Sequence, residues 1–445
     1  MEQYKRLILN TGRVVLTLFL VGLFALVWRQ QYNEMIMQPF KTVGNYLVYA
    51  VYGVIIFVFF KLYGAYRVGF AKFGDLIFSQ ALSLVFTNFL LYAEISLIGR
   101  GLMPVAPLLF TMIEQELVMI GWTLLMQFIY RTLYPPKRML LIFGTESGRS
   151  LQKKIERRPD KFRIQEMISI DNGLKIIESY IEENKANIDA IVIADVKSEK
   201  RNELLKYCFD REIQVYVTPK LSDIIMRASQ DVHLFDTALY QCHNMALTID
   251  ERIVKRTMDI ILSGLVFIIV SPIMLATAVA IKIEDHGPVF FRQKRCTKDE
   301  RVFEILKFRS MIVGAEKDGE VKPATDHDPR ITKVGRIIRP LRIDELPQLL
   351  NILKGDMSIV GPRPERVEHV RKYKELIPEF SYRHKVKAGL TGYAQIMGKY
   401  NTSAYDKLKL DLMYIENYSI FQDLKLILMT IKILFKKESS EGFQQ

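Results

Sequence analysis

Two adjacent carboxylates, Asp344 and Glu345, lie in an arginine-rich part of the chain. Arg339 precedes Asp344 by five residues, and a short helix-forming run, 346–351, follows the pair. Adjacent acids beside cations suit phosphate chemistry, because the cations bind phosphate oxygens while the acids hold a divalent metal or attack phosphorus. Such a pair is also common on ordinary protein surfaces, so this string by itself leaves both interpretations open.

Further cations occur close to this string. Lys307 and Arg309 stand at the end of an apolar segment that is predicted to be a strand, and Arg363 stands between two prolines in the run 361–365 (GPRPE). A stiff loop of this kind fixes a guanidinium so that its fork can meet two phosphate oxygens at once. Anion binding is therefore the favoured interpretation of this region.

Several other enzyme classes are excluded by the motifs that the sequence lacks. There is no Walker glycine loop, kinase catalytic loop, exposed-serine elbow or histidine pair at metal spacing, which argues against an ATPase, kinase, esterase or metalloprotease. The three cysteines, Cys208, Cys242 and Cys296, lack the close spacing of a zinc site or redox pair. They indicate free thiols in a reducing compartment.

The first third of the chain is apolar enough to lie in a membrane. The 445 residues are 49% hydrophobic and carry a formal net charge of +13, and this length allows two or three domains. Four apolar stretches, 14–28, 47–60, 76–98 and 107–130, predict four transmembrane helices. The excess of basic residues then indicates an anionic membrane face and phosphorylated substrates, with no role for nucleic acid.

Basic residues also predict the orientation of these helices. They gather before the first helix, between the second and third, and after the fourth: Lys5, Arg6, Arg13, Lys61, Arg67, Lys72, Arg131, Lys137 and Arg138. The opposite loops carry only Arg29, Lys41 and Arg100. Because cytoplasmic loops are enriched in Lys and Arg, both ends of the bundle are expected to face the cytoplasm.

The pattern changes to alternating strands and helices after Pro135 and Pro136. We predict strands at 139–143, 190–194 and 213–217 and helices at 150–157, 174–184 and 199–207, which implies a parallel sheet wound like half of a Rossmann fold. The turn 144–148 (GTESG) resembles a phosphate-binding loop, but it lacks the third glycine and Glu146 would repel a pyrophosphate. Nucleotide binding and a scaffold role both stay open for this domain.

One more apolar stretch, 260–283, is long enough to cross a membrane. Ser271 and Pro272 lie in its middle, where proline removes a helical hydrogen bond at a cost of roughly 3 kcal/mol and bends the helix. Basic residues flank both sides: Arg252, Lys255, Arg256, Arg292, Lys294 and Arg295. Because a spanning helix has asymmetric flanks, we predict a re-entrant helix at about 258–283, with a fifth transmembrane helix as the alternative.

From Asp250 onward the chain resembles the bacterial sugar transferase family, the monotopic polyprenyl-phosphate phosphoglycosyl transferases. The motifs that carry the resemblance run in the family's order: Ser271-Pro272, 287–293 (GPVFFRQ), 307–311 (KFRSM), 344–350 (DELPQLL), 353–358 (LKGDMS), 360–365 (VGPRPE), 387–393 (KAGLTGY) and 414–418 (YIENY). Tyr393 and Tyr418 stand where the family often has tryptophan, and Ala388 where proline is common. These departures lie outside the catalytic strings.

The whole chain resembles the long form of this family, and the resemblance implies a membrane protein of three domains. They are a transmembrane four-helix domain at 1–135, a Rossmann-like α/β domain at 136–245 and a sugar transferase domain at 250–445. The last is expected to be mainly α (α+β) and to contain the re-entrant helix.

The resemblance also implies the roles of the site residues. Asp344 is expected to be the nucleophile and Glu345 its partner, both at a bound Mg²⁺, while Arg339, Lys307, Arg309 and Arg363 hold the phosphates of the donor. The donor is expected to be a UDP-hexose, with glucose or galactose favoured, and the acceptor undecaprenyl phosphate. Membrane lipid and a homodimer are further expected partners.

The expected location is the bacterial inner membrane, with a multi-pass chain and the catalytic domain on the cytoplasmic face. The reaction would be the first membrane step of exopolysaccharide, capsule or O-antigen synthesis. The alternative from another class is a membrane-anchored nucleotide-sensing scaffold for polysaccharide assembly, against which the intact acid and arginine strings argue. A processive synthase would need a large glycosyltransferase domain and several later membrane spans, neither of which the sequence contains.

Overall fold

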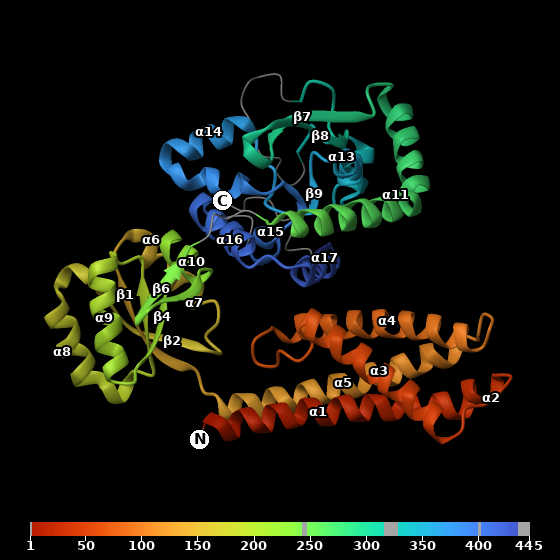
Figure 1. Cartoon of the computed structure of the whole chain (residues 1–445), viewed down its shortest axis with the longest axis horizontal. Coiled ribbons are helices and arrows are strands. Elements are labelled where there is room, and N and C mark those ends of the chain that lie inside the picture. The colour runs from red at the N-terminus through yellow and green to blue at the C-terminus, as the bar shows by residue number, and fades with distance from the viewer. Residues whose placement is uncertain (1, 243–246, 316–327, 399–401, 435–445) are drawn as a thin grey trace. The chain divides into compact units, whose positions relative to one another are not determined.

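The computed structural model describes residues 2–242, 247–315, 328–398 and 402–434 (Figure 1). The chain divides into two compact units, Met1–Pro219 and Lys220–Gln445. The first unit contains a helical bundle followed by an α/β sheet, and the second contains the acid and arginine strings.

Long helices form the N-terminal bundle. They are α1 (Glu2–Val27), α3 (Thr42–Tyr63), α4 (Phe73–Ile98) and α5 (Ala106–Leu133), and α1 continues through a π-helical turn, Trp28–Tyr32, into the short α2 (Asn33–Met35). Each of the four predicted apolar stretches falls within this helical part of the chain. Among the described residues, these helices and α11 (Ile249–Asp285) are the five that are long and apolar enough to cross a membrane.

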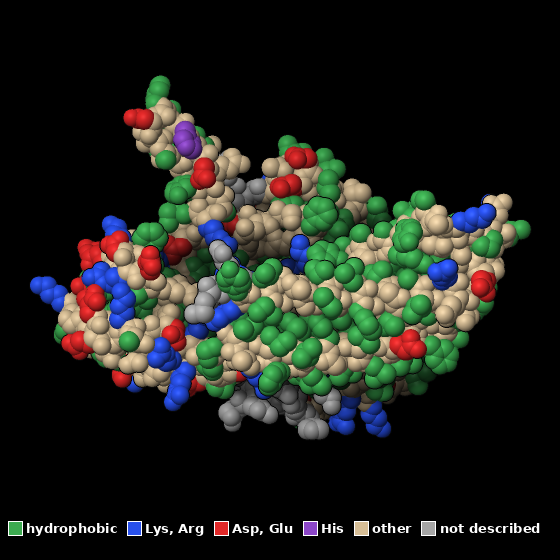
Figure 2. All heavy atoms as spheres, turned by 90° about the horizontal axis from the view of Figure 1, so that it is seen from below, with side chains coloured by type: hydrophobic (Ala, Val, Ile, Leu, Met, Phe, Trp, Pro, Cys, Tyr) green, Lys and Arg blue, Asp and Glu red, His purple; other side chains and the backbone are tan. Residues whose placement is uncertain are grey.

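The bundle is apolar both inside and outside. Aromatic and aliphatic side chains such as Phe24, Tyr52 and Phe60 form its core, while Leu18 and Phe89 are among many large hydrophobic residues on its outer surface. Figure 2 shows hydrophobic side chains gathered along these helices. A helix that is hydrophobic on all sides belongs in lipid or in the core of a larger assembly, so the bundle is that of a membrane-embedded protein.

Buried polar side chains join the helices of the bundle. Gln80 on α4 donates a hydrogen bond to Thr123 on α5 over 2.9 Å, and Gln115 on α5 donates to the Tyr52 hydroxyl on α3 over 2.7 Å. Interhelical hydrogen bonds of this kind stabilise helix packing where water is absent. The amides therefore have a packing role.

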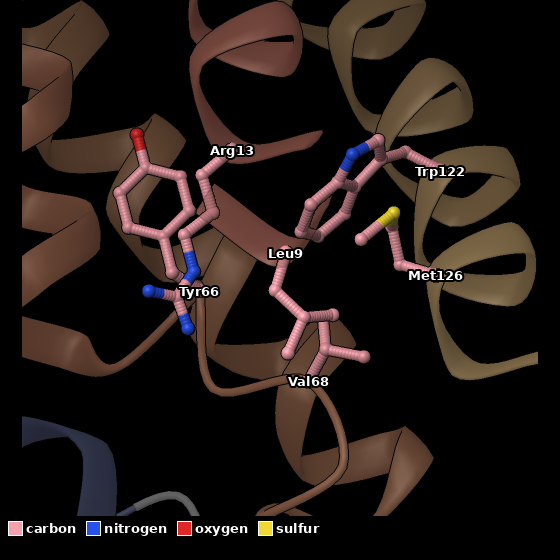
Figure 3. A pocket seen from close by; sticks show the side chains of 6 residues that line it. All are labelled: Leu9, Arg13, Tyr66, Val68, Trp122 and Met126. Atoms are coloured by element: carbon pink, nitrogen blue, oxygen red, sulfur yellow. The ribbon is translucent and has the colours of Figure 1, made fainter. Parts of the chain in front are cut away.

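One end of the bundle brings together the start of α1, the loop between α3 and α4, and the end of α5. Figure 3 shows a crevice there, lined by Leu9, Arg13, Tyr66, Val68, Trp122 and Met126, and its interior is too narrow for a water molecule. The α/β sheet attaches at the same end, where Arg158 donates to the Phe70 carbonyl over 2.7 Å and the Lys161 ammonium lies 3.6 Å from the Phe70 ring.

A parallel sheet forms the rest of the first unit. Its described strands are β1 (Lys137–Phe143), β2 (Phe162–Ser169), β3 (Ala190–Ala194) and β4 (Gln214–Val217), in the order β2-β1-β3-β4. Helices α8 (Leu174–Asn184) and α9 (Ser198–Asp210) cover one face, and the short α6 (Glu146–Arg149) and α7 (Leu151–Ile155) follow β1, with α7 on the other face. The predicted α/β content is confirmed, although β2 was not predicted.

The glycines of the turn after β1 have a packing explanation. A Cβ atom at Gly144 would lie 2.5 Å from the Asp195 carbonyl oxygen, and one at Gly148 would lie 2.6 Å from the Ala194 carbonyl oxygen. The turn therefore needs glycine where it crosses the end of β3, with or without a nucleotide. The two glycines therefore do not by themselves indicate a nucleotide site.

Helices predominate in the second unit. They are α10 (Leu221–Arg227), α11, α12 (Lys333–Ile338), α13 (Gln348–Lys354), α14 (Val367–Leu376), α15 (Tyr393–Met397), α16 (Ala404–Glu416) and α17 (Ile420–Leu434). Three two-stranded sheets occur among the described residues: β5 (Gln230–Leu234) with β6 (Thr237–Gln241), β7 (Phe290–Cys296) with β8 (Val302–Phe308), and β9 (Ser358–Val360) with β10 (Gly389–Thr391). Leu221 and Ile224 of α10 share a core with Leu408 and Leu412 of α16.

Helix α11 contains Pro272 and turns sharply partway along its length (Figure 1). Before Pro272, Asp259 accepts hydrogen bonds from the Ser358 hydroxyl (3.0 Å) and from the Ile359 amide (2.9 Å). After Pro272, Glu284 accepts a hydrogen bond of 2.6 Å from the Lys333 amide. Both arms of the bent helix therefore pack on the same folded unit.

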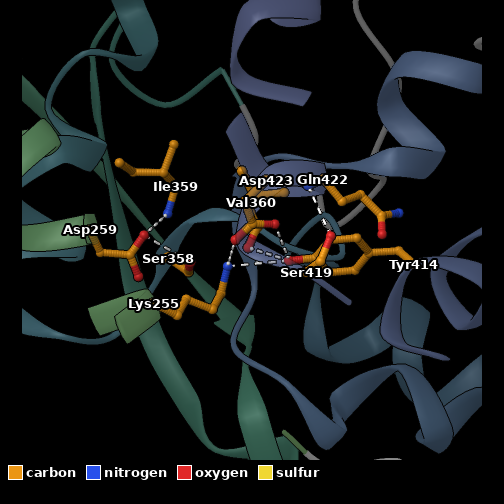
Figure 4. A network of polar contacts seen from close by, with 9 residues as sticks. All are labelled: Lys255, Asp259, Ser358, Ile359, Val360, Tyr414, Ser419, Gln422 and Asp423. Carbon is orange, nitrogen blue, oxygen red and sulfur yellow. Dashed lines mark hydrogen bonds and ion pairs between the residues drawn. The ribbon is translucent and has the colours of Figure 1, made fainter. Parts of the chain in front are cut away.

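A buried polar network anchors the first arm of α11 to α16 and α17 (Figure 4). The Lys255 ammonium lies 2.5 Å from the Asp423 carboxylate and donates to the Tyr414 hydroxyl over 3.2 Å. Tyr414 in turn donates to Asp423 over 2.8 Å. All three side chains are buried, so each charge is compensated inside the fold.

Candidate active site

The two carboxylates occupy a 3-10 turn, Ile343–Glu345, between α12 and α13. Arg342, directly before the turn, has a φ of 55°, in the left-handed region that non-glycine residues rarely adopt. This conformation costs on the order of 1 to 2 kcal/mol and must be held by the surrounding structure. This residue leads directly into the turn, where both acids are partly buried.

Three cations from different parts of the sequence surround Glu345. The Lys307 ammonium on β8 lies 2.6 Å from its carboxylate, and the guanidinium groups of Arg342 and Arg363 lie at 3.8 Å and 4.0 Å. Burial would raise the pKa of Glu345, but the charges of Lys307, Arg363 and Arg342 outweigh it and lower the pKa to about 2. Glu345 is therefore ionised at any physiological pH.

The environment of Asp344 is different. Its carboxylate makes no hydrogen bond or ion pair within the part of the chain that the structure describes. Burial raises its pKa to about 6, and the negative charge of Glu345 adds to this effect against the opposing charges of Lys307, Arg339 and Arg342. Asp344 is thus the acid whose oxygens are available to a ligand or to a reaction, and its raised basicity suits a nucleophile.

Most of the predicted phosphate-binding residues converge on this pair. Lys307 and Arg363 contact Glu345 directly, and the charge of Arg339 acts on Asp344. Arg342, which was not among the predicted phosphate-binding residues, also contacts Glu345. Its position three residues before Glu345 in an arginine-rich string is the sequence feature that could have identified it as a site residue.

Arg309 is placed differently from the other predicted cations. Its buried guanidinium forms an ion pair with Asp285, the last residue of α11, and a Cβ atom at Gly287 would lie 2.1 Å from its Nη1 atom. Among the described residues, no contact joins Arg309 to Asp344 or Glu345. In this structure Arg309 holds the end of α11 against β8, and phosphate binding by Arg309 stays a prediction.

A magnesium ion would fit one of the two predicted ligands better than the other. Among the described residues there is no group of three or more His, Cys, Asp or Glu side chains that could hold a metal ion. Mg²⁺ is commonly bound by one or two carboxylates together with substrate phosphates and water. The uncommitted carboxylate of Asp344 suits this role, whereas Glu345 is already neutralised by cations.

The site as a whole is electropositive. Four cations, Lys307, Arg339, Arg342 and Arg363, act on two carboxylates, which leaves an excess of positive charge. A diphosphate would be attracted to this excess, with the Asp344 carboxylate beside it. The geometry therefore supports attack by an acid on a bound phosphoryl group.

Known proteins are similar in sequence to the part of the chain that contains this site. The family model described as bacterial sugar transferase matches residues 250–437. The UDP-N-acetylgalactosamine-undecaprenyl-phosphate N-acetylgalactosaminephosphotransferase of Aeromonas hydrophila is 39% identical over 250 residues, which are 55% of this chain and 58% of that protein.

Several relatives carry the name UDP-glucose:undecaprenyl-phosphate glucose-1-phosphate transferase, among them the proteins of Escherichia coli K12 and Caulobacter vibrioides. The protein of Escherichia coli K12 is 44% identical over 185 residues, 40% of each chain. That of Caulobacter vibrioides is 41% identical over 192 residues, which are 42% of this chain and 71% of that protein. The matched segments cover only about half of the Aeromonas and Escherichia proteins.

Proposed function

The chain belongs to the bacterial sugar transferase family, and on this basis we propose that it transfers a hexose 1-phosphate from a UDP-sugar to undecaprenyl phosphate. The products are UMP and undecaprenyl-diphosphate-sugar. The observation that carries the proposal is the different environment of the two acids. Glu345 is enclosed by Lys307, Arg342 and Arg363, while the Asp344 carboxylate beside it is uncommitted.

In the first step an Asp344 oxygen attacks the β-phosphorus of the UDP-sugar. The bond from this phosphorus to the bridging oxygen breaks, and UMP leaves with the electron pair. Lys307, Arg339 and Arg363 attract the phosphate oxygens and balance the charge that develops on them. Glu345 keeps its cations in a fixed arrangement, so that little reorganisation is needed during the reaction.

In the second step a phosphate oxygen of undecaprenyl phosphate attacks the same phosphorus and frees the Asp344 carboxylate. Dividing the reaction lets a water-soluble donor and a lipid acceptor use one site in turn. We propose Mg²⁺ as the cofactor, with Asp344 as its protein ligand; the ion would neutralise charge on the donor's phosphates.

We also propose that α11 is re-entrant and that the catalytic domain lies on the cytoplasmic face of the inner membrane. Asp259 and Glu284, on the two arms of α11, bond to the same folded unit. A straight helix of 37 residues would be roughly 55 Å long and would cross a hydrocarbon core of about 30 Å. The sharp bend instead returns the chain to the side from which it entered.

The domain boundaries 1–135, 136–245 and 250–445 remain our proposal for the chain as a whole. The core that α10 shares with α16 favours moving the second boundary toward Pro219. The donor sugar stays a hexose, with glucose or galactose favoured, and the pathway one of exopolysaccharide, capsule or O-antigen synthesis. The homodimer stays a prediction.

The test is the direct detection of a sugar phosphate on Asp344. Membranes or purified full-length protein would be incubated with UDP-glucose or UDP-galactose and Mg²⁺, without a lipid acceptor, and analysed by intact-protein mass spectrometry. We expect an added hexose phosphate and about one UMP per active site. Addition of undecaprenyl phosphate should remove the added mass.

Replacing each acid in turn distinguishes the roles of Asp344 and Glu345. Asp344→Asn should abolish both the adduct and turnover, with a loss on the order of 10⁴, whereas Glu345→Gln should lose about 10²- to 10³-fold. Asp299→Asn, at an exposed acid of the same domain, is the matched control and should retain full activity. Appreciable activity in Asp344→Asn, or release of UMP only when lipid is present, would instead favour direct attack by the acceptor.

A further inference from the structure

The loop that carries Arg363 is held through its backbone carbonyl groups. Four successive carbonyl oxygens each accept a hydrogen bond: Pro362 from the Gly389 amide (2.9 Å), Arg363 from the Arg383 guanidinium (3.0 Å), Pro364 from the Arg295 guanidinium (3.1 Å) and Glu365 from the Cys296 amide (3.0 Å). Two of these four residues are prolines, which have no amide hydrogen to donate. The position of the loop therefore depends on groups that donate to it.

Arg383 is the donor that reaches the Arg363 carbonyl. It lies in the 3-10 segment Pro378–Lys385, and only 2% of its side chain is exposed. Its Nη2 atom is also 2.8 Å from the Asp411 carboxylate on α16, and its Nη1 atom is 3.8 Å from the Glu365 carboxylate. One buried guanidinium thus connects α16 with the middle and the end of the loop.

The carboxylates on either side make this guanidinium difficult to replace. Asp411 is buried and Glu365 is nearly so, and each loses a compensating charge if Arg383 becomes neutral. A lysine would keep the charge, but one ammonium lacks the planar fork that lets Arg383 reach the Arg363 carbonyl and both acids from a fixed position.

Helix α16 is itself firmly fixed, so it can act as the support for this contact. Tyr414, one turn after Asp411, donates to Asp423 and lies 3.4 Å from the Val360 carbonyl at the end of β9. The same helix therefore contacts both the strand that enters the loop and, through Arg383, the loop itself.

The side chain of Arg363 points in the other direction, toward the catalytic acids. It is 47% exposed, and its Nη2 atom lies 4.0 Å from Glu345. Arg383 makes no contact with Asp344 or Glu345 among the described residues. From this arrangement we infer that Arg383 is a positioning residue, which fixes the backbone of Arg363 so that the Arg363 guanidinium meets the phosphate of the donor. The inference rests on the proposed function for the identity of that donor.

A double-mutant cycle tests whether Arg383 acts through Arg363. The full-length chain, in vesicles that contain undecaprenyl phosphate, would be assayed for kcat and for the KM of the UDP-sugar in Arg363→Met, Arg383→Met and the double variant. We expect each single variant to raise this KM about 10- to 100-fold, since a charge-assisted phosphate contact is lost or misplaced. The KM of the double variant should be within about threefold of the KM of the more strongly affected single variant.

Two further variants complete the kinetic test. Arg383→Lys should fall between wild type and Arg383→Met, because it restores charge without the fork. Arg371→Met, at an exposed arginine of the neighbouring helix α14, is the matched control and should leave the KM unchanged. Losses that multiply in the double variant would mean that the two arginines act independently, and the inference would be overturned.

Hydrogen exchange provides a readout that does not depend on turnover. In the protein without substrate, the Gly361 amide donates to Thr391, and the Gly389 and Cys296 amides donate to carbonyl groups of the loop. Arg383→Met should speed exchange at these three amides while the rest of the chain keeps its protection. Unchanged exchange at these amides would overturn the inference even if the transferase activity is present. Accelerated exchange confined to these amides would support it even if the wild-type chain proves to have another activity.

If Arg383→Met loses its structure generally, the exchange measurement would be made in Arg383→Lys and Asp411→Asn, which retain more of the buried contacts. The exchange of the same three amides in those variants then decides the question in the same way.

Discussion

The buried ion pair between Lys255 and Asp423 can be broken from either side, and Lys255→Met is the most informative change. Methionine has nearly the length of the lysine stem but no charge, so the packing of α11 is largely retained. The Asp423 carboxylate, which is fully buried, would then keep, among the described residues, only the hydrogen bond from Tyr414. Its remaining charge would be uncompensated inside the protein.

The expected loss of stability follows from this burial. Removing one partner of a buried ion pair costs about 3 to 5 kcal/mol, far more than the 0 to 1 kcal/mol typical of an exposed pair. The C-terminal unit, Lys220–Gln445, is of a size at which each kcal/mol shifts the melting temperature by about 2 to 4 °C. Lys255→Met should therefore melt about 6 to 20 °C below the wild type.

The chain offers its own reporter for this measurement. Cys296 is a buried thiol in the C-terminal unit, whereas Cys242 is exposed and Cys208 is buried in the first unit. With Cys208→Ala and Cys242→Ser in the background, a thiol-reactive fluorogenic dye would label Cys296 only as the C-terminal unit unfolds. The midpoint of labelling on heating gives the melting temperature in detergent.

Two controls decide whether the burial of the ion pair is the cause of the lower melting temperature. Lys354→Met removes a lysine that is 77% exposed and 3.4 Å from Asp356, and it should shift the midpoint by less than about 4 °C. The double variant Lys255→Met with Asp423→Leu leaves no unpaired charge and should recover most of the loss. The reasoning would be refuted if Lys255→Met melted no lower than Lys354→Met.

The remaining predictions concern topology and acid stability. In a background without Cys242, cysteines placed at Asp250 and Lys294 should both label from the cytoplasmic side of intact cells, and labelling of the second from outside would show that α11 spans the membrane. Burial, and then the charge of Arg383, lowers the pKa of His384 to about 4, so the folded chain should lose roughly 2 to 3 kcal/mol as the pH falls from 6.5 to 4. The stability of His384→Asn, followed by circular dichroism on heating, should depend less on pH across this window; an identical pH profile would contradict the assignment.

The elements that the sequence predicted correctly are those with a strong local pattern. The strand β3, Ala190–Ala194, is apolar at every position because it is buried on both faces, and it was predicted at its full length. The strand β2, Phe162–Ser169, was missed because it lies at the edge of the sheet. Its exposed positions include Arg163 and Glu166, which break the apolar run that marks a central strand.

In the site, too, the features predicted correctly are those encoded in a short string, and the features missed depend on contacts between distant segments. The acid pair was recognisable from one short string, and the resemblance to a family indicated which distant cations belong with it. No local pattern could show that Lys307 and Arg363 converge on Glu345 and leave Asp344 uncommitted, because these contacts depend on how β8 and the loop after β9 pack. The pairing of Arg309 with Asp285 likewise depends on where α11 ends, which the apolar run itself does not specify.

Length and hydropathy cannot separate a re-entrant helix from a spanning one, since α11 satisfies both descriptions. The charged residues next to the apolar run provide the physical distinction. If the helix crossed the bilayer, the charges before and after it would lie in water on opposite sides and would need no common partner. Instead Lys255 and Asp259 on one arm, and Glu284 and Asp285 on the other, are each bonded to segments of one folded unit. Separating the arms across a membrane would break one of these sets and leave its charges without their partners, so the anchors at both ends favour the bend over the span.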